Sequence, residues 1–333
     1  MELAPRIANF QEFSLFSLKM RSTKRGIELY LSGILIYGLG IIIFRLLPYY
    51  QRILQPQTQT VLLYLYFSYL IFAPIIYYFR ATRYTETKPI LFLRGLKRIC
   101  TRLTMEKEEK TAFLFMLVKL FFLPLLLNFF LSHYQQLWQL LSKEVIHFYP
   151  LALTVLFTID TLIFALGYAF EFKLLNNMVK SVEPTLFGWI VTLICYPPFN
   201  TWIGKYILWG ASEQVSFWNQ ELTFVFRIII IIILFIYVSA TIALGLKASN
   251  LTNRGIVQRF PYSLIRHPAY TSKVLVWWLT LLPVMSWPFA LGIFFWTVIY
   301  YFRAITEEKH LSQDPDYQEY CKKVKWRFIP GVY

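Results

Sequence analysis

The chain has 333 residues, of which 57% are hydrophobic and only 15% are charged, and its mean hydropathy is +0.50. Soluble domains carry about 25% charged residues, so this composition excludes a soluble enzyme, a nucleic-acid-binding domain and a disordered chain. The apolar stretches are continuous rather than alternating, which favours membrane-spanning helices over a β-barrel. The net charge of +15 then needs an explanation other than nucleic-acid binding.

The apolar stretches define the predicted membrane helices in chain order. A helix needs about 20 apolar residues to cross a bilayer. Six stretches of this length are present: Ile27–Leu47, Thr60–Phe79, Ala112–Leu131, Phe148–Phe170, Phe187–Tyr206 and Thr223–Leu246. A seventh region, Tyr270–Phe302, is too long for one span and contains Pro283 and Pro288, which predicts a tight hairpin of two short helices. We therefore expect an all-α bundle of about eight transmembrane helices.

The positions of the basic residues predict the orientation of this bundle. The segments 1–26, 80–110, 171–186, 247–269 and 303–333 hold 26 of the 33 lysines and arginines, whereas the opposite loops hold only Arg52, Lys143 and Lys205. The positive-inside rule then places both termini in the cytoplasm. The positive charge is explained by this topology and by contact with anionic membrane lipids, not by nucleic acid. Short loops and a compact tail favour a bacterial inner membrane, with the endoplasmic reticulum as the alternative.

Polar residues interrupt the apolar stretches at three places before the hairpin. Asp160 lies in the middle of a predicted span, Glu171 follows its end, and Asn200 follows two adjacent prolines. Ionisable groups inside a membrane are costly enough to suggest function. Together with Trp277, these residues are candidates for a substrate path. An interhelical polar pair, a charged side chain reaching the interface and a plain helix kink are the alternative interpretations.

The last quarter of the chain carries the residues best suited to chemistry. An RHPAY motif at 266–270 precedes the hairpin, and Arg303 with a TEE motif at 306–308 follows it. The hairpin brings both motifs to one membrane interface, where the tail can fold over them. Carboxylates and aromatic faces beside a bilayer suit a partly cationic cofactor that meets a lipid-soluble substrate. An interfacial anchor is the alternative. The three cysteines have no metal-ligand spacing, so no metal site is expected.

The stretch from Asn250 to Gly331 resembles the isoprenylcysteine carboxyl methyltransferase family. The matching pattern consists of Asn253-Arg254-Gly255, RHPAY at 266–270, Trp277-Trp278, TEE at 306–308, DPDYQEY at 314–320 and RFIPG at 327–331. This order of motifs around a proline-broken hairpin carries the resemblance. It covers about a quarter of the chain and divides it into a membrane domain, 1–246, and a methyltransferase module, 247–333.

The resemblance implies a membrane methyltransferase that uses S-adenosylmethionine under a covering tail. Arg303 and Glu308 match the pair that the family places at the reacting carboxylate. The expected cofactor-binding residues are Arg266, His267, Pro268, Tyr270, Glu307, Tyr317 and Arg327. The acceptor would be a lipophilic small molecule or a lipidated protein, isoprenoid-like or carboxylate-bearing. The 1–246 domain would determine which one.

Two other functions stay open at this point. Sterol reductases also carry an Arg-His-Pro motif and a tail similar to Tyr320-Cys321 and to the terminal Pro330-Gly331-Val332-Tyr333. In that case the cofactor would be NADPH and the substrate a sterol-like alkene. The TEE motif and the Trp277-Trp278 pair fit the methyltransferases better. A membrane scaffold or transporter that uses the same fold without catalysis is the third possibility.

Overall fold

The computed structural model describes residues 4–80 and 86–332, with side chains described for 24–77 and 86–332. The chain divides into two compact units, Met1–Leu125 and Leu126–Tyr333. Among the described residues, six helices are long and apolar enough to cross a membrane. They are Lys24–Leu46, Pro56–Tyr77, Lys107–Leu141, Phe148–Ala169, Gln220–Lys247 and Trp287–Leu311. The chain is therefore a largely helical, polytopic membrane protein.

The first unit is built on its N-terminal helix. It contains α1 (Ala4–Leu46), α2 (Pro48–Ile53), α3 (Pro56–Arg80), α4 (Lys88–Cys100) and the first part of α5 (Lys107–Leu141). Helix α1 packs against α2, α3 and α4. Gly33 and Gly38 allow the close approach of α3, because a Cβ atom at either would lie within 3 Å of the hydroxyl of Tyr69 or Tyr66.

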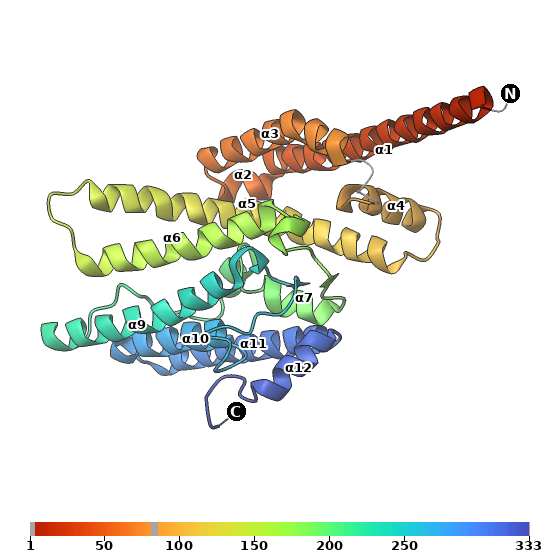
Figure 1. The fold of residues 1–333 in the computed structure, drawn as a ribbon. Helices are drawn as coiled ribbons and strands as arrows, with labels where there is room; N and C mark the ends of the chain where they lie inside the picture. Colours follow the sequence, from red (N-terminus) through yellow and green to blue (C-terminus); the bar gives the residue numbers. More distant parts are fainter. Residues whose placement is uncertain (1–3, 81–85, 333) are drawn as a thin grey trace. The chain divides into compact units, whose positions relative to one another are not determined.

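The second unit is a bundle that contains the whole hairpin region. Its elements after α5 are α6 (Phe148–Ala169), η1 (Lys173–Leu175), β1 (Ser181–Val182), α7 (Leu186–Leu193), α8 (Phe199–Ile203), α9 (Gln220–Leu244), η2 (Gly245–Lys247), β2 (Thr252–Asn253), α10 (Pro268–Leu281), η3 (Leu282–Val284), α11 (Trp287–Leu311) and α12 (Pro315–Lys323). Helix α9 packs against α6 and α10, and α11 packs against α7 and α10 (Figure 1). Ile230, Val276, Leu281 and Ile293 are buried in this core.

The proline-broken hairpin is present, and one of its helices is longer than predicted. Helix α10 has 14 residues and ends in η3, which contains Pro283. Helix α11 has 25 residues, with Pro288 in its first turn. A proline in the first turn costs no hydrogen bond because those N–H groups have no helical acceptor. The expectation of two short helices is therefore wrong for the second helix.

The predicted span Phe187–Tyr206 is not a continuous helix. Helix α7 has eight residues, about 12 Å of rise, and the chain then turns through Pro197-Pro198 before the five-residue α8. Two adjacent prolines remove two backbone donors and clash with the preceding turn. The part of the chain that the structure describes therefore has six long apolar helices. The predicted total of eight transmembrane helices and the cytoplasmic position of both termini stay predictions.

A short ladder joins two loops at one end of the second unit. Strands β1 and β2 are antiparallel, with Ser181 opposite Asn253 and Val182 opposite Thr252. The ladder continues on both sides, where the Lys180 and Glu183 N–H groups donate to the carbonyls of Asn253 and Leu251 at 2.8 Å each. The ladder thereby holds residues 249–252 beside Glu183, next to the C-terminal half of α11.

Candidate active site

One face of α11 forms the wall of a small cavity. Arg303, Thr306, Glu307 and His310 have the spacing i, i+3, i+4 and i+7, which puts them on one stripe of a helix. The cavity is about 30 Å³ and is lined by Glu183, Thr192, Ser249, Asn250, Leu251, Thr252, Tyr270, Arg303, Thr306, Glu307, His310 and Leu311. We call this the Arg303 cavity. It combines residues of the two predicted motifs with residues before position 247.

The Arg303 guanidinium lies in an aromatic surround inside this cavity. Its side chain is buried, and it donates a hydrogen bond to the Asn250 Oδ1 atom. Its Cζ atom lies 5.1 Å from the ring centre of Tyr270, 5.5 Å from that of Tyr300 and 5.7 Å from that of Tyr196. Among the described residues, no carboxylate forms an ion pair with Arg303 within 4.0 Å. The result is a buried cation held by neutral groups.

Glu307 supplies a carboxylate to the same cavity. The Tyr270 hydroxyl donates to Glu307 Oε2 at 2.6 Å, which ties the start of α10 to α11. Arg303 and Glu307 are one helical turn apart, yet they form no ion pair within 4.0 Å. The cavity therefore presents a cationic and an anionic group separately to a bound molecule.

Glu308 faces a different direction and holds three cationic or donor side chains. Five residues along a helix correspond to a rotation of about 140°, so Glu308 does not share the Arg303 face. Its carboxylate contacts His267 Nε2 at 3.1 Å, Arg327 Nε at 2.9 Å and an Arg266 guanidinium nitrogen at 3.4 Å. We call these four residues the Glu308 clamp. Glu308 forms no ion pair with Arg303 within 4.0 Å, and its predicted place at the reacting carboxylate stays a prediction.

The clamp fixes the tail along the start of α10. The Arg266 and His267 N–H groups donate to the carbonyls of Trp326 and Arg327 at 2.9 Å each. Thr271 adds a side-chain hydrogen bond of 3.3 Å to the Phe328 carbonyl. The tail therefore lies over the RHPAY motif, as predicted from the sequence.

His267 and Pro268 set the geometry at the beginning of α10. Pro268 is the first residue of the helix, where its fixed φ is compatible with the helix and its missing N–H costs nothing. The His267 ring stacks in parallel on Tyr270, with 5.4 Å between centroids and 5° between planes. His267 is buried and is oriented from the other side by Glu308. The histidine thus links the clamp to an aromatic wall of the Arg303 cavity.

Tyr317 places an unsatisfied hydroxyl beside the two glutamates. It lies on α12, which Asp314 caps by accepting from the Asp316 N–H at 3.1 Å. The Tyr317 hydroxyl oxygen is buried and has no hydrogen-bond partner among the described residues. Burial raises the pKa of this phenol, and the Glu308 and Glu307 carboxylates raise it further. Tyr317 therefore keeps its proton and offers a hydrogen-bond donor.

The Asn253-Arg254-Gly255 motif positions the loop that lines the cavity. Asn253 donates to Asp314 Oδ2 at 2.9 Å, which joins β2 to the start of α12. Arg254 is buried and donates to the Gly167 carbonyl at 2.8 Å near the end of α6. Gly255 has a φ of +95°, a conformation that disfavours other residues. These contacts give the motif a positioning role.

The four substrate-path candidates lie outside the lining of the Arg303 cavity. Buried Asp160 accepts from Tyr237 at 2.9 Å and from Thr241 at 2.6 Å, which is an interhelical polar cluster. Glu171 accepts from the Val179 N–H, and Asn200 accepts from Thr201. Trp277 is buried and packs edge-on against Trp209 and Tyr300. A role in a substrate path stays a prediction for each.

Sequence reasoning missed Asn250, Tyr196 and Lys273. Asn250 is the hydrogen-bond partner of Arg303, and Tyr196 is one of its aromatic neighbours. Lys273 lies one turn beyond Tyr270 on α10, with its Nζ atom 5.8 Å from the Trp277 ring centre. The helical spacing of Tyr270, Lys273 and Trp277 was a signal that could have identified the lysine. The approach of residue 196 to residue 303 had no sequence signal.

Comparison with known proteins bears on the part of the chain that contains this geometry. Residues 221–314 match the family model described as Phospholipid methyltransferase. This part of the chain is similar to the phospholipid methyltransferases. The matched range contains the Arg303 wall, the TEE motif and the RHPAY motif, and it ends before Tyr317 and Arg327. No curated protein matches the chain.

The match confirms the predicted resemblance at the level of membrane methyltransferases. It supports a methyltransferase that works in a membrane on lipid-like substrates, and members of this family generally use S-adenosylmethionine.

Proposed function

We propose that this protein transfers a methyl group from S-adenosylmethionine to an oxygen of a lipophilic, carboxylate-bearing acceptor. The observation that carries the proposal is the buried Arg303 guanidinium, which has aromatic and amide neighbours and no carboxylate partner among the described residues. A buried cation is costly unless an anion balances it. A planar guanidinium fork matches the two oxygens of a carboxylate. An anionic acceptor would therefore complete this arrangement.

The residues around the Arg303 cavity fit S-adenosylmethionine in their chemistry. Glu307 suits the positive groups of the cofactor, since cationic groups form charge-assisted hydrogen bonds with carboxylates. The unsatisfied Tyr317 hydroxyl offers a donor to its polar groups. When bound, S-adenosylmethionine supplies an electrophilic methyl group on a sulfonium.

Catalysis would then consist mainly of alignment. Arg303 holds the anionic end of the acceptor, so that one carboxylate oxygen faces the methyl group. The nucleophile is already ionised, which means that no side chain has to remove a proton. Well-oriented reactants can gain about 7–11 kcal/mol from positioning and exclusion of water. Asn250 and the three tyrosines keep the guanidinium in place for this task.

Glu308 has a positioning role in this proposal. Its carboxylate is already engaged by His267, Arg266 and Arg327, so it holds the tail on the start of α10. Through His267 it also orients the Tyr270 ring in the wall of the Arg303 cavity. This assignment differs from the resemblance, which places Glu308 beside the reacting carboxylate.

An amine acceptor is the second candidate, and the family match favours it. The matched family is described by its phospholipid substrates, and some phospholipid headgroups carry an amine. Transfer to an ammonium group needs a base for its proton, and Glu307 is the carboxylate that lines the cavity. This reaction would leave the buried Arg303 guanidinium without an anionic partner, so the geometry of the cavity favours the carboxylate acceptor.

Cofactor binding by the full-length protein in detergent is the first test of the proposal. Calorimetry would compare S-adenosylmethionine and S-adenosylhomocysteine with NADPH. We expect micromolar binding of the first two and its loss in His267→Ala, with Lys309→Gln unchanged because Lys309 is exposed on α11. Binding of NADPH alone would replace the proposal with a reductase. Binding of no cofactor would indicate a scaffold or transporter.

A further inference from the structure

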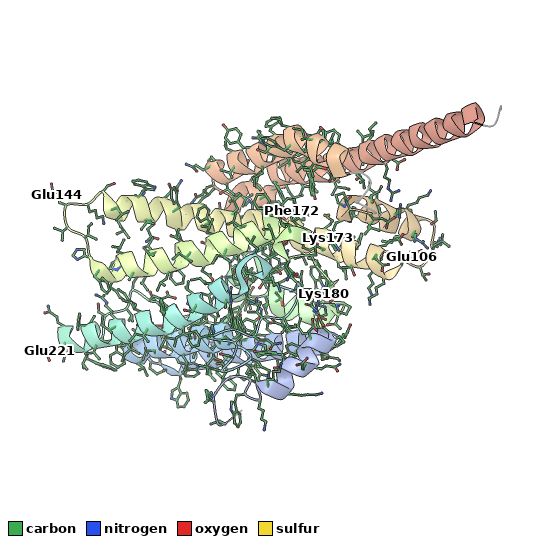
Figure 2. The ribbon with its side chains drawn as sticks, viewed as in Figure 1. Glu106, Glu144, Phe172, Lys173, Lys180 and Glu221 are labelled. Atoms are coloured by element: carbon green, nitrogen blue, oxygen red, sulfur yellow. The ribbon has the colours of Figure 1, made fainter. Side chains whose placement is uncertain are left out.

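A second and larger cavity lies in the same unit at the far end of α6 and α9. It has a volume of about 550 Å³ and is lined by Phe148, Tyr149, Ser216, Phe217, Asn219, Gln220, Thr223, Phe224, Arg227, Ile228 and Ile231. Figure 2 shows Glu221, at the start of α9, and Lys180, near α12, at opposite ends of the second unit. The large cavity adjoins Glu221 and is therefore remote from the Arg303 cavity.

Arg227 is the charged residue in this lining. It lies two turns into α9, within the apolar stretch Gln220–Lys247. Its Cζ atom lies 4.8 Å from the ring centre of Tyr149, whose hydroxyl is held by the Glu213 carbonyl at 2.5 Å. The Arg227 Nε atom is buried and has no hydrogen-bond partner among the described residues. The cation thus has an aromatic neighbour and an unused donor.

The charge of Arg227 calls for an anionic partner. Ionisable groups in membrane spans are rare and are normally paired or placed at a water-filled cavity. No ion pair within 4.0 Å joins Arg227 to a carboxylate of the described residues, Glu213 and Glu221 included. The contact with Tyr149 offsets only part of the cost of removing the guanidinium from water.

The rest of the lining identifies the kind of anion. Phe148 and Phe224 are two-thirds exposed at the cavity, and Ile228 and Ile231 continue its apolar wall along α9. Ser216, Asn219 and Gln220 add polar atoms at the same helix end. A positive group between polar atoms and an apolar helix face matches a phosphodiester that carries acyl chains.

We propose that this cavity binds the headgroup of an acidic phospholipid, with Arg227 on the phosphate and the acyl chains along α9. The site is separate from the methyltransferase site and does not rest on the function proposed for it. The phosphate would pair with the Arg227 guanidinium, which has no carboxylate partner among the described residues, and the neighbouring apolar residues would cover the upper part of the acyl chains. An acidic headgroup is specified because a zwitterionic lipid carries its own ammonium as counter-charge.

Native mass spectrometry of the full-length protein in detergent would test this site. The probes are phosphatidylglycerol, phosphatidylcholine and inorganic phosphate, each added at the same concentration. We expect retained phosphatidylglycerol adducts with the wild type and about tenfold weaker binding with Arg227→Gln, because a charge-assisted hydrogen bond is lost. Arg227→Lys should retain most of the binding. Lys205→Gln, a matched loss of an exposed charge, should behave as wild type.

A cavity-filling variant provides a second test that keeps the arginine. Ile228→Trp should weaken phosphatidylglycerol binding while leaving the charge of Arg227 in place. Two results would overturn the assignment to an acidic lipid. One is equal binding of phosphatidylcholine and phosphatidylglycerol, and the other is retained adducts of inorganic phosphate without retained phosphatidylglycerol. Unchanged phosphatidylglycerol binding in both Arg227→Gln and Ile228→Trp would show that the lipid binds elsewhere.

Discussion

Arg303 has surroundings that are unusual for a residue whose role is only structural. Structural arginines in low-dielectric sites are normally paired with a carboxylate, whereas this one contacts Asn250 and the rings of Tyr196, Tyr270 and Tyr300. The nearest acidic residues on its helix are engaged by other groups, since Glu307 accepts from Tyr270 and Glu308 holds the clamp. The side chain is therefore arranged to meet a partner from outside the chain.

Substitution of Arg303 should separate catalysis from cofactor binding. We expect Arg303→Gln to lower kcat by about 100-fold, because a preorganised donor at the reacting group is lost, with little change in cofactor affinity. Arg303→Lys should recover only part of the rate, since an ammonium lacks the planar fork. The measurement is methyl transfer at saturating cofactor, with Lys309→Gln as control. A normal rate in Arg303→Gln would exclude this role.

Glu308 gives a test that distinguishes a positioning role from a catalytic one. If it holds the clamp, Glu308→Gln should weaken cofactor affinity by about tenfold through loss of charged hydrogen bonds and change kcat little. The exposed Glu319 offers a control as Glu319→Gln. A 100-fold fall in kcat at unchanged cofactor affinity would instead support the role at the reacting carboxylate that the resemblance implies.

The contact between α12 and β2 predicts that the stability of α12 depends on pH. Partial burial disfavours the Asp314 carboxylate, but hydrogen bonds from Asn253 and Lys180 outweigh it and lower the pKa of Asp314. The hydrogen bond that the Lys180 ammonium donates to Asp314 raises the pKa of Lys180 against a smaller effect of burial. The carboxylate of Asp314 thus contributes to folding stability above its unfolded pKa of about 3.9. This contribution is lost as the pH falls through the lowered pKa of the folded state.

The contribution of Lys180 to folding stability has the opposite dependence on pH. It is present below the unfolded lysine pKa of about 10.4 and is lost as pH rises through the raised value. We expect α12 to resist proteolysis best between about pH 5 and 9, and Asp314→Asn to flatten the loss on the acid side. Because Lys180 is half exposed, the effect should be small. An unaltered acid profile in Asp314→Asn would contradict this account.

At the scale of elements, the sequence patterns predicted the helices that are continuous and apolar. The hairpin follows from Pro283 and Pro288, and the long helices α6 and α9 lie close to their predicted ranges. The prediction of a span at Phe187–Tyr206 was wrong. The composition of this stretch is apolar, but Pro197-Pro198 prevents a continuous ladder of helical hydrogen bonds. Hydropathy measures transfer into lipid and does not measure helix continuity.

The orientation of side chains around a helix explains why the site was only partly predicted. Arg303, Glu307 and Glu308 were identified by motif, but their grouping required the 100° step per residue. That step puts Glu307 with Arg303 and turns Glu308 towards the tail. Asn250 and Glu183 reach the cavity through the two-residue ladder, which is too short to leave a pattern in the sequence.

The tail and the 249–252 loop should respond to the cofactor. The Arg303 cavity measures about 30 Å³, whereas ligand pockets are about 300–1,000 Å³. Binding must therefore separate the cavity walls. We expect S-adenosylhomocysteine to change hydrogen–deuterium exchange in residues 249–252 and 324–332, with residues 60–70 of the first unit as reference. Exchange that is identical with and without ligand would contradict binding at this cavity.

At the scale of the whole molecule, the second unit contains both proposed binding sites. The Arg303 cavity is lined by the C-terminal half of α11, and the Arg227 cavity lies at the start of α9. The Arg303 cavity also includes Glu183 and Thr192, which precede the predicted module boundary at residue 247. That boundary and the substrate-selecting role of residues 1–246 stay predictions.

The most direct test of the central claim is the alkaline lability of the transferred methyl group. The full-length protein would be incubated with methyl-labelled S-adenosylmethionine and a membrane lipid extract, and the lipid product would be treated with base. A methyl ester releases volatile labelled methanol, whereas a methylated amine does not. We predict labelled lipid that releases its label in base and that is absent with Arg303→Gln. Label that stays non-volatile after base treatment would contradict transfer to a carboxylate.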